Sequence, residues 1–421
     1  MQKLTTISRT LVGALFIVSG LIKANDAVGF SFKLHDYFVP DVLDIPFFLD
    51  YVYPLAVFIC IAEILLGLAV LVGAKMRLTA FSLLLMILFF DGLTFYSAYF
   101  NKVTDCGCFG DAIKLTPWES FAKDVVLSVL IFIIVAFHAK VKYQTNKVNL
   151  KILPVALVLV GLFSHYVLDW FLPVYFTLIL FVLTWLVNKF LLKEIREWTL
   201  AALALITCIA FSYHTYSHLP IRDYRPYAIG KNIAVDMVLP EGAQADVYED
   251  VWKYELNGIV SDYTTQDKPW EIQGATFVDR ETKLILEGDH PPIHDFSIES
   301  DALGDITDSI LKASNAVLFV MYDLAKSDDE GLQKVQKIIN ELDQEAVSIV
   351  AMSATTESQM LSICQEAGVS IPFFFTDETT LKTIVRANPG MLWLQEGTIV
   401  NKWHHNDFPS ADDLKKQYLN N

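Results

Sequence analysis

The sequence contains no Walker loop, no Gly-x-Gly-x-x-Gly fingerprint and no Gly-x-Ser-x-Gly elbow. These motifs place backbone N–H groups or a nucleophile against a phosphate or an acyl group, so their absence disfavours nucleotide-driven and hydrolase chemistry. Positive charge is also in short supply, because 32 Lys and Arg face 48 Asp and Glu, a net charge of −16. Without a basic aromatic patch, the sequence predicts no nucleic-acid partner.

Cysteine is rare, with five in 421 residues, and only Cys106 and Cys108 lie close together, one glycine apart. A Cys-x-Cys disulfide closes a small strained ring, so it is easily reduced, as exchange catalysts require. Redox chemistry is therefore predicted at Cys106 and Cys108. Two alternatives stay open: a structural disulfide that fixes the loop, and two ligands of a metal centre. Cys60, Cys208 and Cys364 have no sequence-local partner, and Cys364 is expected to pack inside a helix.

The first half of the chain is strongly apolar. Hydrophobic residues make up 53% of the sequence, and the mean hydropathy is +0.40. A helix needs about 20 apolar residues to cross the hydrocarbon core of a membrane. Stretches near that length occur at residues 7–22, 52–72, 78–99, 118–137, 153–167, 174–192 and 199–213. Seven membrane-spanning helices are therefore predicted.

Two of these stretches have alternatives. The fifth, at residues 153–167, is shortened by His165 and Asp169, so a hairpin that only partly enters the bilayer would leave five or six spans. The first could be a cleaved signal peptide. Lys23 and Asn25, however, stand where small residues would mark the cleavage site, and a full membrane domain follows.

Basic residues flank the predicted helices on one side of the membrane, and such residues concentrate in cytoplasmic loops. With a cytoplasmic N-terminus, every basic cluster falls on the cytoplasmic side of a bacterial inner membrane. These residues are Lys3, Arg9, Lys75, Arg77, Lys140, Lys142, Lys147, Lys151, Lys189, Lys193 and Arg196. The loop with Cys106 and Cys108, and everything after His214, then lie in the periplasm. That compartment is oxidising, so its thiols are expected to be paired or cycled.

Ionisable residues also lie within the predicted helices. Glu63 is midway down the second helix, and Asp91 is in the outer half of the third. Lys123 and Asp124 are two turns into the fourth helix, and Lys23 ends the first. A charge inside a bilayer is costly and usually has a partner or a function. These residues predict either an ion-paired network that holds four helices together, or a proton path and quinone head-group site beneath the dithiol.

Three segments carry a resemblance to a known family. They are Arg-Thr-Leu-Val-Gly-Ala-Leu-Phe-Ile-Val-Ser-Gly-Leu-Ile-Lys at residues 9–23, Glu-Ile-Leu-Leu-Gly-Leu from Glu63, and Cys-Gly-Cys-Phe-Gly at residues 106–110. Residues 4–142 resemble the DoxX and MauE superfamily of four-helix, redox-associated membrane proteins. The full chain is similar to the longer, Bacteroidota-type members of this superfamily, in which a periplasmic thioredoxin-like domain follows the membrane helices. By analogy with vitamin K epoxide reductase-like bundles, the resemblance implies a role in thiol or quinone redox.

The segment after residue 219 is acidic and divides in two. It holds 16 Lys and Arg against 34 Asp and Glu, whereas residues 1–219 hold 16 against 14. Residues 233–298 alternate short apolar runs with turn signals such as Asn257-Gly258, which predicts antiparallel hairpins. From residue 316 a strand, helix, strand, helix succession is predicted, at residues 317–322, 329–342, 347–352 and 357–367. A short helix at 381–385, strands at 391–395 and 399–403, and a helix from 410 follow.

That succession resembles the thioredoxin fold, with Pro389 in the position of its cis-proline. The Cys-x-x-Cys pair of that fold should follow the first strand, at a helix start that lowers a thiol pKa. The sequence from Tyr322 is Tyr-Asp-Leu-Ala-Lys-Ser-Asp, with no cysteine. The domain is therefore expected to recognise a substrate strand or to dock a partner redox protein, at a groove beside Asn388 and Pro389.

No metal site is predicted. His290, His294 and Asp295 share one loop, and His404 adjoins His405. Neither spacing matches a standard zinc pattern, which needs three or four ligands.

These features predict a membrane α-helical bundle, with a DoxX- and MauE-like four-helix core plus extra helices, followed by a soluble α/β thioredoxin-like domain with a β-rich lead-in. The expected domains are residues 1–145, 146–219 with about three more helices, 220–312 and 313–421. The expected function is a relay of electrons between periplasmic thiol proteins and membrane quinone. It would pass through Cys106 and Cys108, with Glu63, Asp91 and Asp124 handling protons and Lys23, Lys123, Asn388 and Pro389 in binding roles. The alternative is a non-enzymatic, lipid-embedded scaffold whose thioredoxin-like domain binds envelope proteins.

Overall fold

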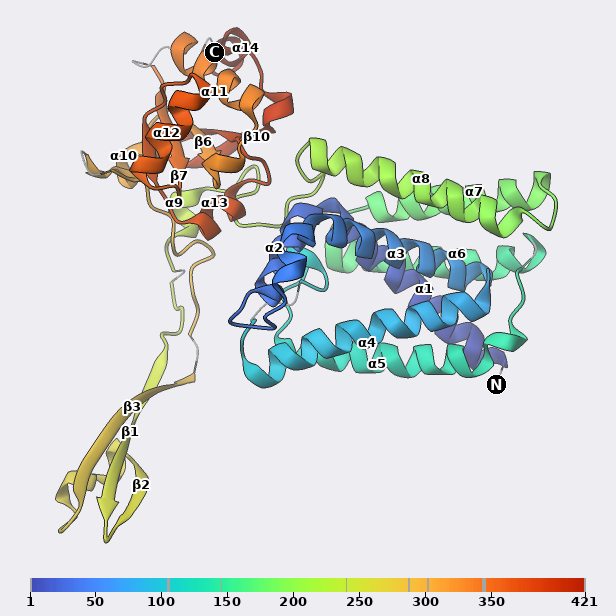
Figure 1. Cartoon of the computed structure of the whole chain (residues 1–421), viewed down its shortest axis with the longest axis horizontal. Helices are drawn as coiled ribbons and strands as arrows, with labels where there is room; N and C mark the ends of the chain where they lie inside the picture. Colours follow the sequence, from blue (N-terminus) through green and yellow to red (C-terminus); the bar gives the residue numbers. More distant parts are fainter. Residues whose placement is uncertain are drawn as a thin grey trace.

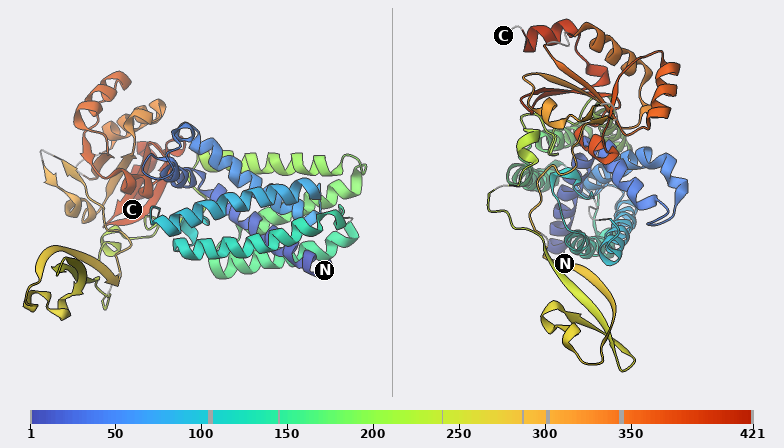
Figure 2. Two further views of the ribbon diagram at one scale, coloured as in Figure 1. Left: turned by 60° about the horizontal axis from the view of Figure 1, so that its bottom comes forward. Right: turned by 90° about the vertical axis from the view of Figure 1, so that its left-hand side faces the viewer.

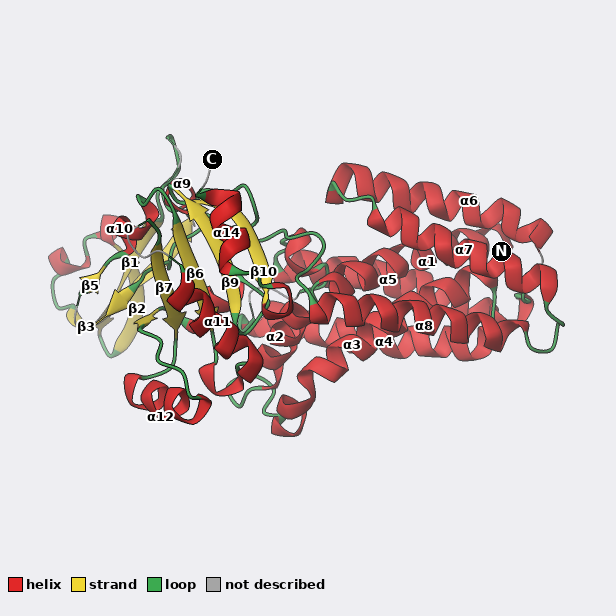
Figure 3. Cartoon of the chain, turned by 90° about the horizontal axis from the view of Figure 1, so that it is seen from above, coloured by secondary structure: helices red, strands yellow, loops and turns green. Residues whose placement is uncertain are grey.

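The computed structural model describes residues 2–103, 107–144, 146–239, 241–286, 288–300, 303–342 and 346–419. A helical bundle forms one body, and an α/β domain lies at one end of it (Figure 1). Viewed from above, helices occupy the bundle and strands gather only on the other side (Figure 3). A slender three-stranded arm projects away from both bodies (Figure 2).

The bundle contains seven described helices that are long and apolar enough to cross a membrane, as predicted. They are α1 (Gln2–Asn25), α3 (Val52–Val72), α4 (Met76–Phe100), α5 (Pro117–Phe137), α6 (Asn146–Phe163), α7 (Leu172–Phe190) and α8 (Arg196–Ser217). The fifth span is of full length, because a π-helical turn over Ser164–Leu168 continues α6 past His165. The chain is thus a multi-pass membrane protein.

Helix α1 lies at the centre of the bundle, since 72% of its 18-residue apolar stretch is buried inside the protein. It packs most closely against α3, where two glycines face each other. A Cβ atom on Gly67 would lie 2.9 Å from the carbonyl oxygen of Gly13, so only glycine lets the two backbones approach this far. Helix α3 ends at Val72, and the C-cap residue Gly73 adopts the left-handed conformation, with φ of 76°.

The two ends of the bundle differ in what they carry. We call the end with the N-terminus of α1 the basic end, because Lys75, Arg77, Lys140 and Lys147 lie at the helix termini there. The opposite end, where the α/β domain attaches, is called the domain end (Figure 1). Helix α2 (Ala27–Phe38) lies at the domain end and begins at Asp26, whose carboxylate accepts a hydrogen bond from the Gly29 N–H at 2.8 Å.

The α/β domain is built on a sheet of strand order β10-β9-β6-β7-β8-β4-β5. Strands β6 (Ala316–Met321), β7 (Ser348–Ser353) and β8 (Phe373–Phe375) are parallel. Strands β9 (Gly390–Gln395) and β10 (Thr398–His404) form an antiparallel hairpin on the other side of β6. Short strands β4 (Glu299–Ser300) and β5 (Gly304–Asp305) extend the edge next to β8. The predicted thioredoxin-like succession of elements is confirmed.

Helices cover both faces of this sheet. All six residues of β6 are buried, and they alternate between two cores. Val317 and Phe319 pack with α11 (Asp329–Glu341), α12 (Glu357–Ala367) and α14 (Ala411–Tyr418). Leu318 and Val320 pack with α10 (Thr307–Leu311), α13 (Glu378–Ile384) and the short α9 (Ile233–Asp236). Because alternate residues of β6 are buried on opposite faces of the sheet, every residue of the strand is apolar.

The arm is a separate three-stranded antiparallel sheet of order β2-β1-β3. It consists of β1 (Val247–Leu256), β2 (Ile259–Thr264) and β3 (Thr276–Leu286). The predicted Asn257-Gly258 turn joins β1 to β2, with φ of 56° and 83° at the two positions. All eleven positions of β3 are exposed, so the arm packs only on itself, through rings such as Trp252, Trp270 and Phe277.

Candidate functional site

Cys108 lies in the loop between α4 and α5, at the domain end of the bundle. Gly107, with φ of 63°, turns the chain beside Lys33 of α2, where a Cβ atom would come within 3.1 Å of the lysine Cγ. The N–H of Gly110 donates to the carbonyl oxygen of Gly107 at 3.0 Å. The Ser19 hydroxyl of α1 donates to the Cys108 carbonyl oxygen at 3.3 Å. The loop is thus tied to both α1 and α2, with Cys108 half-buried.

Cys106 lies outside the described residues. The predicted pairing of Cys106 with Cys108 therefore stays a prediction.

Lys23 and Glu63 form a buried ion pair between α1 and α3. Lys23 Nζ contacts Glu63 Oε1, and each side chain is only 3% exposed. The ammonium also lies 4.7 Å from the ring centroid of Phe90. Glu63 Oε2 has no hydrogen-bond partner among the described residues. One oxygen of the carboxylate is thus held by a cation, and the other is left to accept a proton or a water.

A second ion pair lies on α5. Lys123 Nζ is 2.6 Å from Asp124 Oδ1, and the Asp124 side chain is 2% exposed. The Thr94 hydroxyl of α4 donates to Asp124 Oδ2 at 3.3 Å. Lys123 also lies 5.2 Å from the ring of Phe109, the residue after Cys108. The α5 pair is therefore adjacent to the cysteine loop.

Cys108 lines two small cavities that bring these groups together. One, of about 20 Å³, is lined by Lys23, Glu63, Lys123 and Asp124 together with Cys108. The other, of about 10 Å³, lies on the α2 side of Lys23 and Cys108. Each volume suits about one water molecule. Four of the residues predicted from the sequence thus line one cavity together with Cys108.

Asp91 lies apart from this cluster. Its Oδ2 accepts a hydrogen bond from the Ser128 hydroxyl of α5 at 2.5 Å, and it lines neither cavity beside Cys108. The structure therefore brings together two of the three predicted carboxylates, Glu63 and Asp124. Asp91 links α4 to α5.

Arg386 connects the α/β domain to the cysteine loop. It follows α13, and its guanidinium lies 2.9 Å from Asp26 at the start of α2 and 3.1 Å from Asp111, three residues after Cys108. The Arg386 side chain is 7% exposed. A Cβ atom on Gly29 would lie 2.6 Å from the guanidinium, so this glycine makes room for it. Sequence reasoning missed this contact because the partners are 360 and 275 positions apart.

An aromatic contact supports the same docking. The ring of Phe32 on α2 packs edge-on against Tyr322 at 5.9 Å. Lys382 and Arg386 lie 4.9 and 5.4 Å from the same ring. Tyr322 directly follows β6, where a thioredoxin fold carries its cysteine pair. Burial raises the pKa of Tyr322 to about 12. The cysteine-free loop of the α/β domain thus faces the helix that contacts Gly107.

The linker after α8 holds a buried ionic cluster. Lys402 Nζ lies 2.9 Å from Asp223, and Arg225 Nε lies 2.7 Å from the same carboxylate. Burial favours a higher pKa for Asp223, but Arg225 and Lys402 outweigh it and hold that pKa well below its usual range. Burial, with Arg225 nearby, lowers the pKa of Lys402 to about 8. These groups fix the linker to the sheet.

The peptide bond between Asn388 and Pro389 is cis, as its position predicted. The Asn388 carbonyl oxygen accepts a hydrogen bond from the Asp328 N–H at 3.1 Å. The Asn388 amide donates to the Asp323 carbonyl oxygen at 2.6 Å. Pro389 is buried against Gly331 of α11. These contacts lie within the α/β domain, and the predicted binding role of Asn388 and Pro389 stays a prediction.

No group of three His, Cys, Asp or Glu that could hold a metal ion occurs within the described residues. The rings of His404 and His405 are tilted by 37° to each other, with centroids 3.9 Å apart. His294 pairs with its neighbour Asp295 at 3.4 Å.

The membrane part of this site has relatives. Residues 1–137 match the family model of methylamine utilisation protein MauE. The MauE-like region ends with α5, so it carries Lys23, Glu63, Cys108, Lys123 and Asp124. Helices α6 to α8, the arm and the α/β domain lie beyond it. The predicted likeness to DoxX and to Bacteroidota-type members stays a prediction.

Two further comparisons concern the whole chain. No curated protein sequence matches it. Among solved structures, the chain is similar to a solution structure from Bacteroides thetaiotaomicron, named as a candidate protein disulfide isomerase. The identity is 15%, the TM-score is 0.26, and the match covers 30% of this chain and 87% of the other.

Proposed function

We propose that this protein is a membrane-bound thiol redox protein whose exchanging pair is Cys106 and Cys108. One observation carries the proposal: Cys108 shares a water-sized cavity with Lys23, Glu63, Lys123 and Asp124. Neighbouring cations favour the thiolate, which is the nucleophile in disulfide exchange. Carboxylates beside the same cavity can take the protons that a thiol releases.

The chemistry is a two-electron exchange. A reduced Cys106–Cys108 pair loses two electrons and two protons when its disulfide forms, and a partner disulfide is reduced to two thiols by the same electrons and protons. In the opposite direction, two thiols of a substrate protein are oxidised and the loop is reduced. Glu63 and Asp124 are the groups placed to hold these protons, while Lys23 and Lys123 offset their charge.

The electron acceptor in this proposal is a membrane quinone, which becomes a quinol by taking two electrons and two protons. The cavities beside Cys108 hold about 10 and 20 Å³, which suits water and not a quinone ring. In the described conformation these two cavities have room for water and not for the quinone ring.

The proposal places the domain end in the periplasm of a bacterial inner membrane. Its support is the cluster of Lys and Arg at the basic end, since such residues mark the cytoplasmic side. The partners in this compartment would be periplasmic thiol proteins. The α/β domain docks beside the cysteine loop through Arg386, so it would restrict which partners reach the loop.

Thiol trapping in intact cells tests the proposal. The full chain is alkylated rapidly under conditions in which quinone is abundant or depleted, and the redox state of Cys106 and Cys108 is read by mass spectrometry. We expect the pair to be oxidised with quinone and reduced without it. Cys364→Ser is the matched control, because Cys364 lies far along the chain in α12 and should leave the response unchanged.

Two outcomes separate the parts of the proposal. If the redox state of the pair responds to the supply of thiol proteins and not to quinone, the electron acceptor is another compound and not quinone. A pair that keeps one redox state under every condition would overturn the redox role.

A non-enzymatic scaffold is the second candidate function. It is favoured by the loop after β6, which carries no cysteine from Tyr322 to Asp328. Affinity capture of the full chain, compared with a Pro389→Ala variant, tests it. A partner that depends on Pro389 while Cys108→Ser has no effect would support the scaffold, and the absence of such a partner would exclude it.

A further inference from the structure

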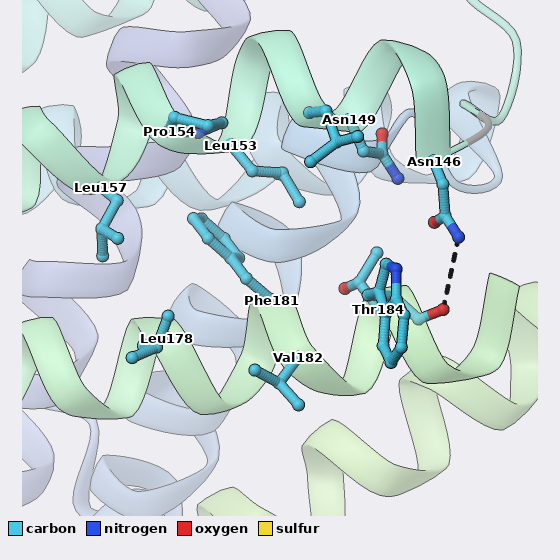
Figure 4. A pocket seen from close by; sticks show the side chains of 11 residues that line it. Asn146, Asn149, Leu153, Pro154, Leu157, Leu178, Phe181, Val182 and Thr184 are labelled. Carbon is cyan, nitrogen blue, oxygen red and sulfur yellow. Dashed lines mark hydrogen bonds between the residues drawn. The ribbon is translucent and has the colours of Figure 1, made fainter. Parts of the chain in front are cut away.

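A groove of about 260 Å³ lies between α6 and α7, at the basic end of the bundle (Figure 4). It is lined by Asn146, Asn149, Leu150, Leu153, Pro154, Leu157, Leu178, Phe181, Val182, Thr184 and Trp185. Neither helix belongs to the MauE-like region, and the groove contains none of the redox residues. Its interpretation therefore stands independently of the proposed function.

The groove is apolar along most of its length and polar at one end. Leucine and phenylalanine side chains line the inner part, and Asn146 and Asn149 lie at the start of α6 (Figure 4). Asn146 donates to the carbonyl oxygen of Trp185 at 3.5 Å. An amphipathic molecule with a chain and a polar head matches this gradient.

Asn149 ties the polar end of the groove to the segment before α6. Its side chain lines the groove and is 3% exposed. The Asn149 amide N–H donates to the Gln144 carbonyl oxygen at 3.3 Å.

Two lysines lie near the polar end of the groove. Lys189 is one turn beyond Trp185 on α7, and its ammonium lies 4.7 Å from the Trp185 ring centroid. Residues four apart share a helix face, so Lys189 extends the groove wall. Lys147 follows Asn146 at the start of α6. Both lysines can face an anionic head group.

We infer that this groove binds an anionic phospholipid. One acyl chain lies between α6 and α7, and the phosphate faces Lys147 and Lys189. A quinone fits less well, because its ring is neutral. Its carbonyl oxygens can accept hydrogen bonds from the lysines, but they bring no negative charge to pair with the two ammonium groups.

Native mass spectrometry of the delipidated full chain tests the inference, with phosphatidylglycerol, phosphatidylcholine and ubiquinone added separately. We expect phosphatidylglycerol to bind roughly thirtyfold more tightly than phosphatidylcholine, from two lysines at about fivefold each. Leu157→Trp, which fills the groove, should abolish that preference. Val158→Trp is the matched control, because Val158 is the next residue, 60% exposed and outside the groove.

If Leu157→Trp fails to fold, a variant with two surface substitutions still tests the inference. The double variant Lys147→Gln, Lys189→Gln should bring phosphatidylglycerol binding down to the level of phosphatidylcholine. Equal binding of the two lipids by the unaltered chain would overturn the inference. Equal effects of Leu157→Trp and Val158→Trp would indicate lipid bound all around the bundle and would overturn the inference. Ubiquinone binding that Leu157→Trp abolishes and Val158→Trp leaves unchanged would assign the groove to a quinone, and would overturn it too.

Discussion

The two ends of the helical bundle solve the problem of polar groups in a membrane in different ways. At the domain end, Lys23 pairs with Glu63 and Lys123 with Asp124. Arg386 of the α/β domain pairs with Asp26 at the same end. At the basic end, Lys189 lies over the Trp185 ring beside an apolar groove between α6 and α7. The charges at the domain end are paired within the chain, whereas Lys189 at the basic end is exposed beside the groove.

This difference bears on where chemistry can take place. A site that exchanges electrons and protons needs charges fixed in a small, wet volume, and the domain end provides that around Cys108. A site for a lipid needs length and apolar surface, which the groove between α6 and α7 provides. The following changes would break or sharpen this contrast.

Removing one partner of the Lys23–Glu63 pair should have the largest effect. Lys23→Met leaves Glu63 charged and buried, which costs about 3–5 kcal/mol. Thermal unfolding of the purified protein in detergent should show a large loss of stability. The double variant Lys23→Met, Glu63→Gln removes both charges, so it should recover most of that loss. A single variant as stable as the unaltered chain would show that the pair is not the anchor of this end.

Loosening the docked domain should have the next largest effect. Arg386→Gln removes a cation from two carboxylates, and we expect about 1–3 kcal/mol less docking stability. Hydrogen exchange should rise in α2 and in residues 107–115, and maleimide should label Cys108 faster. Arg222→Gln is the control, because Arg222 pairs at the surface with Asp169, which is 83% exposed. Equal exchange in both variants would remove Arg386 from this role.

Acid should weaken the α/β domain. Burial, and then the neighbouring His405, lowers the pKa of His404 from 6.5 to about 4. The unfolded chain therefore binds a proton first, so this stability is present above pH 6.5 and is lost as the pH falls toward about 4. We expect this change to cost roughly 1–2 kcal/mol of stability. Melting curves of His404→Gln should depend less on pH over this window, whereas His294→Gln, with its side chain 69% exposed, should melt as the parent does.

The smallest effect concerns the start of α5, directly after the cysteine loop. Thr116 and Glu119 form a capping box at this helix N-terminus. Thr116→Ala should cost about 1 kcal/mol and speed hydrogen exchange in the first turn. Thr199→Ala serves for comparison, because Thr199 donates only to the Ile195 carbonyl within α8. Unchanged exchange in Thr116→Ala would show that packing, not the cap, fixes the helix start.

Local patterns predicted much of this architecture. Apolar length gave the seven spans, including the end of α3 at Val72. The order of strands and helices placed Pro389 before β9, and the Asn257-Gly258 pair marked a hairpin. Each of these depends on neighbours within about twenty residues, which a single sequence records.

The rest depends on distant contacts. Nothing near Arg386 indicates that it meets Asp26 and Asp111, because charge pairing across hundreds of residues leaves no periodic signal. The separation of Asp91 from Cys108 could not be predicted either, because the depth of a residue along a helix does not give the direction of its side chain. The groove between α6 and α7 arises only when two helices are packed together.

The three-stranded arm has a practical consequence. Its turn at Asn257 and Gly258 is exposed, and β3 buries nothing against the rest of the protein. Loop tips of this kind tolerate insertions. A small folded tag placed between these two residues would add a recognisable feature for electron microscopy to a membrane protein of 47.5 kDa, and it would leave the cysteine loop and the lipid-facing helices untouched.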